Sequence, residues 1–271
     1  MRLSGFLVLG LLGMAGPRPN RSVVVRDPVS TLTVLPGETV ALEALDRRWT
    51  WTAPRAPGLY PLHVVSTDRR DSLTIQAFVL VPYATLRGEY LNGYRIGRYP
   101  ARALRGLDIY RPPAGFIEVT RDNEDVFVSP HFQLKQFVCK QAGGYPKYVV
   151  LNAQLIARLE QLLALVNASG YDVATFAVMS GYRTPAYNHA IGNVAYSRHT
   201  WGSAADIFID TNHDGRMDDL NGDGVSDVRD AEVLYRLFEG PQGSGGLGKY
   251  RATEAHGPFV HVDIRDRRAR W

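Results

Sequence analysis

Ser197-Arg-His-Thr-Trp-Gly-Ser-Ala-Ala-Asp206 is the most informative stretch of this chain, and Phe259-Val-His-Val-Asp263 is its counterpart further along. The end of the first stretch is apolar enough for a buried strand, and Asp206 lies inside it, where a carboxylate needs a partner or a metal ion. In the second stretch, alternation places His261 and Asp263 on one face of a strand. The two stretches therefore predict two strands whose polar side chains share a partner.

A metal ion is the partner that the side-chain types favour. His199, Asp206 and His261 offer two imidazoles and one carboxylate, a set that suits zinc. Three protein ligands leave a fourth position open, which is typical of a catalytic zinc site, where the ion polarises a carbonyl and lowers the pKa of water to about 7. The alternative is that these are surface or core histidines with other partners, because two histidines and an aspartate are a common inventory.

Several motifs occur in an order that resembles a known family. They are Ser-Gly-Tyr-Arg-Thr at 180–184, Ser-x-His-x-x-Gly-x-Ala-x-Asp at 197–206, and His-Val-Asp-Ile-Arg at 261–265, followed by Arg-Trp at 270–271. This pattern resembles the M15 peptidases, which are zinc D-Ala-D-Ala carboxypeptidases and murein endopeptidases. The closest likeness is to the subgroup of uncharacterised domains near the bacterial murein endopeptidases. It covers roughly residues 132–271.

The resemblance implies roles for individual residues. It makes His199, Asp206 and His261 the zinc ligands, and Arg183 the arginine that binds the substrate carboxylate or the polarised carbonyl. It also places Tyr182 and Ser197 beside the substrate. The implied fold is that of the hedgehog and D-Ala-D-Ala-peptidase type, with a mainly antiparallel sheet.

One position departs from the family pattern. Many relatives place an acidic general base three residues before the last zinc histidine, where this chain has Pro258. The remaining candidates are Asp263, which shares a strand face with His261, and then His256 and Glu254 in the preceding loop. Asp263 is the favoured base; the alternative is a carboxylate that orients a histidine ligand.

A second constellation predicts calcium. In the loop that begins at Asp219, oxygen-bearing residues occupy positions 1, 3, 5, 7, 9 and 12, with glycine at position 6, as in calcium loops. These residues are Asp219, Asn221, Asp223, Val225 (through its carbonyl), Asp227 and Asp230. An overlapping loop repeats the first part and offers a possible second calcium site at Asp210, Asn212, Asp214 and Asp218. The alternative is a solvated acidic insertion at 210–230.

The chain divides into segments that differ in composition and in hydrophobic pattern. Residues 1–15 carry one arginine and a short apolar run, which predicts a secretory signal, with an uncleaved anchor as the alternative. Residues 20–82 read as short strands separated by turns, a small β-sandwich that resembles immunoglobulin-like modules. Residues 83–130 form a Gly-, Pro- and Arg-rich connector that either wraps the catalytic unit or is a plain linker. Residues 131–271 are the zinc peptidase unit.

The expected fold of the peptidase unit is α+β. Leucines at helical spacing predict a helix over residues 152–168, and a second helix is expected over 229–239, both packed on one face of the sheet. The formal net charge of +4 is modest, and no basic stripe interleaved with aromatics indicates nucleic acid. Cys139 is the single cysteine, so no internal disulfide is possible.

The sequence thus leaves two classes of function. The first is a zinc peptidase of the periplasm or cell envelope that hydrolyses peptide bonds in peptidoglycan stem peptides or cross-links; it is expected to be a monomer without stable membrane insertion. The second is a zinc-loaded but inactive wall-binding or interaction module, which the missing acid at Pro258 keeps open.

Overall fold

The structure is a computed structural model that describes residues 19–239 and 245–271. The predicted signal at residues 1–15 lies outside the described residues. Among the described helices, none combines the length and the apolar character that crossing a membrane requires.

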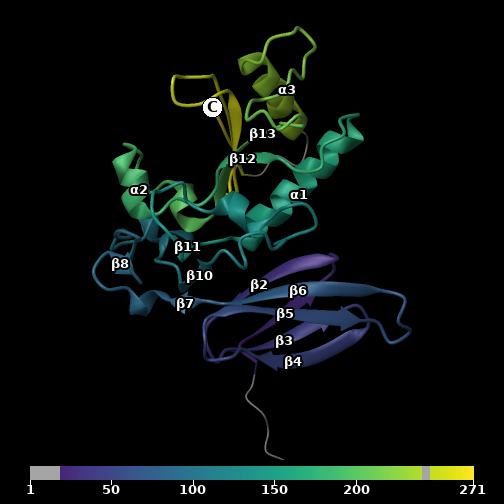
Figure 1. Cartoon of the computed structure of the whole chain (residues 1–271), viewed down its shortest axis with the longest axis vertical. Helices are drawn as coiled ribbons and strands as arrows, with labels where there is room; N and C mark the ends of the chain where they lie inside the picture. Colours follow the sequence, from purple (N-terminus) through teal and green to yellow (C-terminus); the bar gives the residue numbers. More distant parts are fainter. Residues whose placement is uncertain (1–18, 240–244) are drawn as a thin grey trace, which may run out of the picture.

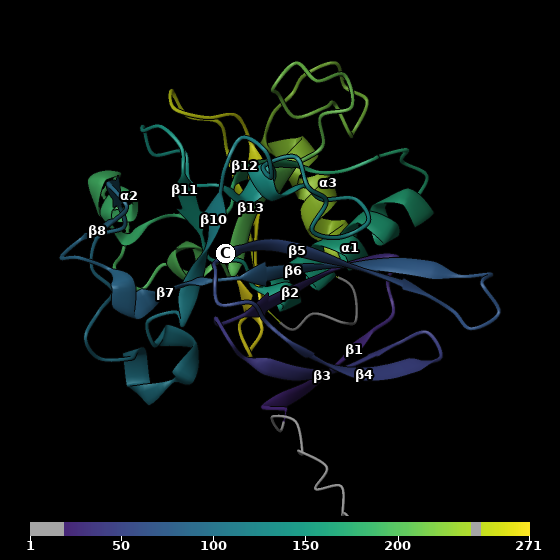
Figure 2. The same cartoon turned by 60° about the horizontal axis from the view of Figure 1, so that its bottom comes forward.

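The N-terminal part contains two three-stranded sheets that face each other (Figures 1 and 2). One sheet has the order β1-β3-β4 and the other has the order β2-β6-β5. Their bounds are β1 Arg21–Val25, β2 Val29–Val34, β3 Thr39–Ala44, β4 Arg47–Thr52, β5 Gly58–Val65 and β6 Ser72–Val79. Alternating apolar residues of both sheets enclose a core of their own, which includes Val40 and Ile75. Each sheet contains one parallel pair, β1 with β3 and β2 with β6.

The segment after this unit contributes strands and core residues to the second unit. Its sheet has the order β11-β10-β7, formed by β7 Val81–Pro82, β10 Gly115–Val119 and β11 Lys147–Val149. Phe116 of β10 is fully buried in the same core as the peptidase-unit helices. A hairpin of β8 Tyr90–Leu91 and β9 Tyr94–Arg95 turns at Asn92 and Gly93, which both have positive φ, as a tight two-residue turn requires.

The shorter helical turns of the chain are all 3-10 helices. They are η1 Tyr83–Thr85, η2 Leu104–Gly106, η3 Asp108–Tyr110, η4 Leu134–Phe137 and η5 Arg198–Trp201. The last of these, η5, carries His199 and leads directly into the central sheet.

The central sheet of the second unit has five strands in the order β12-β13-β15-β14-β16. They are β12 Ala177–Ser180, β13 Ala204–Phe208, β14 Gly246–Tyr250, β15 Phe259–Asp263 and β16 Ala269–Arg270. All neighbours are antiparallel except β14 and β16. The prediction of a mixed α+β unit built mainly on an antiparallel sheet is confirmed, whereas the likeness of the N-terminal unit to immunoglobulin modules stays a prediction.

Three α-helices accompany this sheet. Helix α1 (Ala153–Ala168) begins at Asn152, whose side chain accepts a hydrogen bond from the Gln154 N–H, and it buries the leucine stripe that the sequence predicts. Helix α2 (Pro185–Ala190) follows β12, and α3 (Val228–Phe238) packs on β14 and β15. Helices α1 and α3 contribute to the core together with Ala205, Ile207, Val260 and Val262, so Asp206 and His261, which alternate with these residues, leave the opposite face of the sheet.

Candidate metal centre

His199, Asp206 and His261 converge in space. Their candidate ligand atoms all lie within 4.8 Å of one another, and within the described part of the chain this is the only such group of three or more His, Cys, Asp or Glu side chains. Nε2 of His199 lies 3.4 Å from Oδ1 of Asp206 and 3.3 Å from Nδ1 of His261. Nδ1 of His261 lies 2.8 Å from the same Asp206 oxygen. One atom of each side chain therefore points at a common position.

Strand register accounts for this convergence. Asp206 on β13 is the direct antiparallel partner of His261 on β15, so their side chains leave the same face of the sheet side by side. His199 comes from η5, which ends at Gly202 with φ +61. A Cβ on Gly202 would lie 2.0 Å from the carbonyl oxygen of Val150, so only glycine allows the turn that returns the chain from His199 to β13.

The ring nitrogens that face away from the group also have partners. Nδ1 of His199 lies 2.7 Å from the carbonyl oxygen of Gly181, so this nitrogen donates and Nε2 is left as the lone-pair donor. Nε2 of His261 faces Oδ2 of Asp263 at 3.4 Å, which leaves Nδ1 toward Asp206. Partners of this kind orient metal-binding histidines and fix their tautomers. The residues therefore fit a zinc ion.

The electrostatics of the three side chains are strongly coupled. Burial opposes ionisation of Asp206, but His199 and His261 outweigh it and hold the pKa of that carboxyl well below its usual range. Burial lowers the pKa of His199. Burial also acts against protonation of His261, yet its hydrogen bonds to Asp206 and Asp263 raise its pKa to about 8. Without a metal ion, the two carboxylates thus favour the protonated form of His261.

The predicted substrate residues have different fates. Arg183 lines the cavity beside the metal group; its Nε donates to the Ser180 hydroxyl at 2.7 Å, and its Nη2 is ion-paired with Oδ2 of Asp206. Ser197 also lines the cavity. Tyr182 does not: its side chain is 1% exposed and its hydroxyl bonds to Tyr99 at 3.0 Å. The prediction that Tyr182 contacts substrate is therefore wrong, because its ring is part of the core.

Asp263 is placed as an orienting carboxylate rather than as a base. It faces Nε2 of His261, the nitrogen on the side of the ring away from the metal group. Its oxygens accept hydrogen bonds from the Gly246 N–H and from the backbone and guanidinium of Arg265, and Arg198 lies 3.8 Å away. Burial opposes ionisation, but His261 and Arg265 lower the pKa of Asp263 far below its usual range. A carboxylate so weakly basic and so fully engaged does not fit the general-base role that the sequence favoured.

The loop candidates for the base lie outside the cavity. His256 packs edge-on against Phe259, with ring centroids 5.0 Å apart, and its Nδ1 contacts the Gly257 carbonyl at 2.9 Å. Glu254 is exposed, and neither residue is among those that line the cavity. In this conformation, neither side chain is placed to move a proton at the metal group.

The cavity around the metal group has a volume of about 320 Å³. Its walls contain residues that sequence reasoning did not single out as functional: Tyr110, Tyr196, Arg198, Tyr250, Arg267 and Trp271. The Trp271 indole lies 5.3 Å from the His261 ring, and the Tyr110 ring lies 5.3 Å from the Arg198 guanidinium. Arg198 and Trp271 belong to quoted motifs, so a signal existed for them, whereas Tyr110 comes from the connector and no pattern points to it.

The predicted calcium loop does not form a comparable group of acids. Asp219 accepts from the N–H groups of its own loop, such as that of Gly224, and Asp230 accepts from the Leu220 and Asn221 N–H groups. Asp223 and Asp227 are both paired with Arg229. In the preceding loop, bonds within the loop likewise engage Asp210, Asn212, Asp214 and Asp218. Calcium stays a prediction at both loops.

Comparison with known proteins supports the resemblance seen in the motifs. Residues 130–221 match the family model described as Peptidase M15. The matched segment contains Arg183, His199 and Asp206 and ends before His261. A search of curated proteins found no match to this chain. The predicted resemblance to the M15 peptidases is confirmed for residues 130–221, about a third of the chain.

Proposed function

We propose that this protein is a zinc-dependent peptidase that hydrolyses peptide bonds in the stem peptides or cross-links of peptidoglycan. The observation that carries the proposal is the convergence of His199, Asp206 and His261 at a cavity, with the outward ring nitrogens of both histidines already partnered. The family match supports the peptidase part, and the resemblance of the motifs to those of murein-cleaving peptidases supports the substrate.

Each residue of the site has a defined task in this proposal. The three ligands would hold zinc, which supplies Lewis-acid polarisation of the scissile carbonyl and activates water near neutral pH. Arg183 fixes Asp206 and presents its guanidinium to the cavity, where it can bind a substrate carboxylate or carbonyl oxygen. Asp263, held by Arg265, keeps the His261 ring oriented so that Nδ1 faces Asp206, from where it would bind the ion.

The second candidate function is a zinc-loaded module that binds the wall without cutting it. One observation favours it: Asp206 and Asp263 are the only acids that line the cavity in the described chain, and both are fully engaged. Among the residues that the structure describes, no free carboxylate therefore stands beside the metal group to serve as base.

Incubation of purified murein with the protein separates the two candidates. The enzyme is expected to release soluble muropeptides, and both a chelator and His199→Ala should abolish release, because each removes the metal. Mass spectrometry of the products then identifies the bond that is cut. Zinc-loaded protein that binds murein but releases nothing would establish the binding module instead.

We also propose a calcium ion in the loop from Asp219 to Asp230, supported by the oxygen spacing and by positive φ at Gly224. The ion would have to displace Arg229 from Asp223 and Asp227. At a hundredfold excess over its Kd, calcium should stabilise the fold by about 2.7 kcal/mol. The melting temperature of zinc-saturated protein should therefore rise with calcium, and Asp223→Ala should abolish the rise. An unchanged melting curve would identify a solvated acidic insertion.

The place of action follows from the substrate. We propose the periplasm or cell envelope, supported by the apolar run within residues 1–15. Fractionation of cells that express the full chain tests this, with retention in the cytoplasm as the contrary result.

A further inference from the structure

A second concave site lies in the N-terminal unit, away from the metal group. It is a groove of about 920 Å³ between β4 and β5, the edge strands of the two facing sheets. Its lining residues are Asp46–Trp49 on the side of β4, and Pro61–Val65 and Thr67 on the side of β5. Its size reaches the upper end of the range for small-molecule sites, about 300–1,000 Å³.

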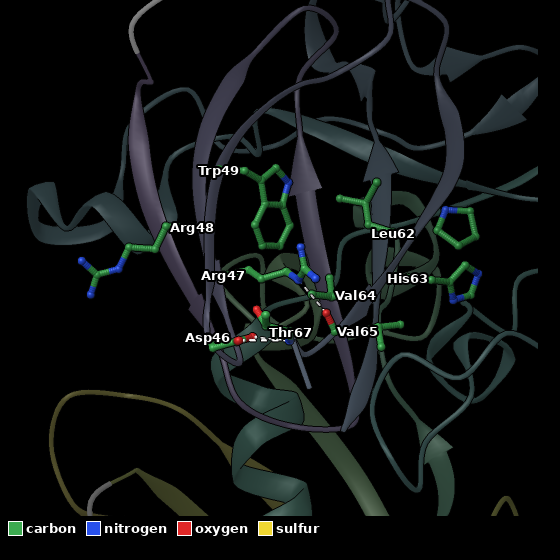
Figure 3. Close-up of a pocket in the computed structure, with 10 residues that line it drawn as sticks. Asp46, Arg47, Arg48, Trp49, Leu62, His63, Val64, Val65 and Thr67 are labelled. Carbon is green, nitrogen blue, oxygen red and sulfur yellow. Dashed lines mark hydrogen bonds between the residues drawn. The ribbon is translucent and has the colours of Figure 1, made fainter. Parts of the chain in front are cut away.

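The groove combines an aromatic wall with a cation. Figure 3 shows Trp49 and Leu62 on opposite sides, with the guanidinium of Arg47 between them. Nε of Arg47 donates to the Val65 carbonyl at 2.6 Å, a bond that spans the gap between the sheets. Within the described chain, the terminal nitrogens of Arg47 have no hydrogen-bond partner. The side chain is therefore anchored through one nitrogen and presents the rest of its fork to the groove.

The same end of the groove is closed by a second link. The Asp46 carboxylate accepts the Thr67 N–H at 3.0 and 3.2 Å, so this acid is already used. Arg48 pairs with Glu43 at 2.8 Å and points away from the groove in Figure 3. The charge that remains available inside the groove is thus that of Arg47, and the complementary ligand is anionic.

The edges of β4 and β5 are poorly suited to an added peptide strand. Pro61 removes a backbone donor in the middle of β5, and Arg47 already caps the carbonyl of Val65. A peptide bound by strand addition needs a continuous row of such groups. A ligand that binds through the ring face of Trp49 and the guanidinium of Arg47 needs no such row of backbone groups.

We propose that this groove binds an acidic saccharide chain. The C–H faces of a pyranose carry slight positive charge and suit the negative face of the half-buried Trp49 indole. A carboxylate on the same sugar reaches the free fork of Arg47, the geometry that guanidinium groups recognise best.

Isothermal titration of the full chain tests the proposal with three probes. The first is peptidoglycan glycan strands stripped of peptide by an amidase, in which every muramic acid bears a free carboxylate. Chitohexaose offers similar rings without charge, and hexaglutamate offers charge on a peptide. Because the stripped strands contain no peptide bond, the result does not depend on whether the protein is a peptidase.

Wild type should bind the stripped strands about 10- to 100-fold more tightly than chitohexaose, the range expected for hydrogen bonds to a charged group. Arg47→Gln should erase that difference, and Trp49→Ala should weaken both saccharides. Arg70→Gln is the matched control, because Arg70 is also an exposed arginine of the same unit and lies outside the groove.

Equal affinity of wild type for the two saccharides would overturn the proposal, as would unchanged binding by Arg47→Gln. Binding of hexaglutamate as tight as that of the stripped strands would show that the ligand is an acidic peptide. Thermal melting checks that each variant is folded. If Trp49→Ala does not fold, Arg47→Gln still tests the proposal, because Arg47 is exposed whereas Trp49 packs against the core.

Discussion

At the scale of single residues, the orientation of the His261 ring decides the role of its neighbours. Because Nδ1 faces Asp206, the opposite nitrogen faces Asp263, and Asp263 therefore lies on the side of the ring away from the metal position. Sequence alternation correctly puts His261 and Asp263 on one face of β15. Alternation carries no information on the side-chain torsion angles that decide which ring nitrogen faces which neighbour. For this reason the predicted ligand residues lie together, whereas Asp263 does not fit the predicted role of base.

Asp263→Asn should weaken zinc binding by about 10- to 100-fold, the usual effect of losing a partner that orients a metal-bound histidine. Competition with a chromogenic chelator measures this, with Asp266→Asn, an exposed acid just beyond the strand, as the control. A variant with unchanged zinc affinity and lost turnover would instead reinstate Asp263 as the base.

Zinc affinity should depend on pH through His261. Its pKa in the metal-free protein is raised to about 8, and the imidazole must lose that proton to bind zinc, so affinity should rise with pH and level off above about 8. Chelator competition at a series of pH values records the curve. In Asp263→Asn the inflection should move to lower pH, because one of the groups that favour the charged ring is gone; an inflection that stays in place would contradict this.

At the scale of elements, helix α1 and the two ligand-bearing strands could be read from the sequence because periodic burial leaves a periodic pattern. The arrangement of the connector at residues 83–130 could not be predicted in this way. Strand β10 is short and lies among loops, and Tyr110 reaches the cavity wall only through tertiary packing. Position in an irregular segment depends on contacts far along the chain, which local patterning does not record.

The turn between η5 and β13 should be intolerant of any side chain at Gly202. Gly202→Ala combines a positive φ, which costs about 1–2 kcal/mol, with a Cβ 2.0 Å from a backbone oxygen, which adds about 1–3 kcal/mol of strain. Gly192→Ala is the matched control, since Gly192 has φ +73 with nothing within 4 Å of the added atom. Urea unfolding should show a clearly larger loss of unfolding free energy for Gly202→Ala than for Gly192→Ala. Equal losses would mean that the close approach to Val150 is relieved.

At the scale of the whole molecule, the two cores meet near residue 80, not near residue 130. The larger core begins with Phe78 and Leu80 and includes Phe116 and Ile117 of β10, which are almost completely buried. The contacts with the N-terminal unit include Leu35 and Leu59, which pack against this core, and a hydrogen bond from the Thr31 hydroxyl to the Val128 carbonyl.

A fragment of residues 80–271 should therefore unfold cooperatively and bind zinc, whereas residues 131–271 should not fold, because they lack β10. Circular dichroism melts and zinc titration of the two fragments make the comparison. A stable, zinc-binding fragment of residues 131–271 would show that β10 is dispensable.

The direct pairing of Asp206 with His261 across β13 and β15 would link metal binding to the alignment of these two strands during folding. A shift of one residue between these strands would turn one of the two side chains to the opposite face and destroy the cradle. Since only the correctly aligned sheet could hold the ion, zinc binding would favour that alignment over pairings slipped by one residue. The ion would thus also stabilise the correct register of the sheet that binds it.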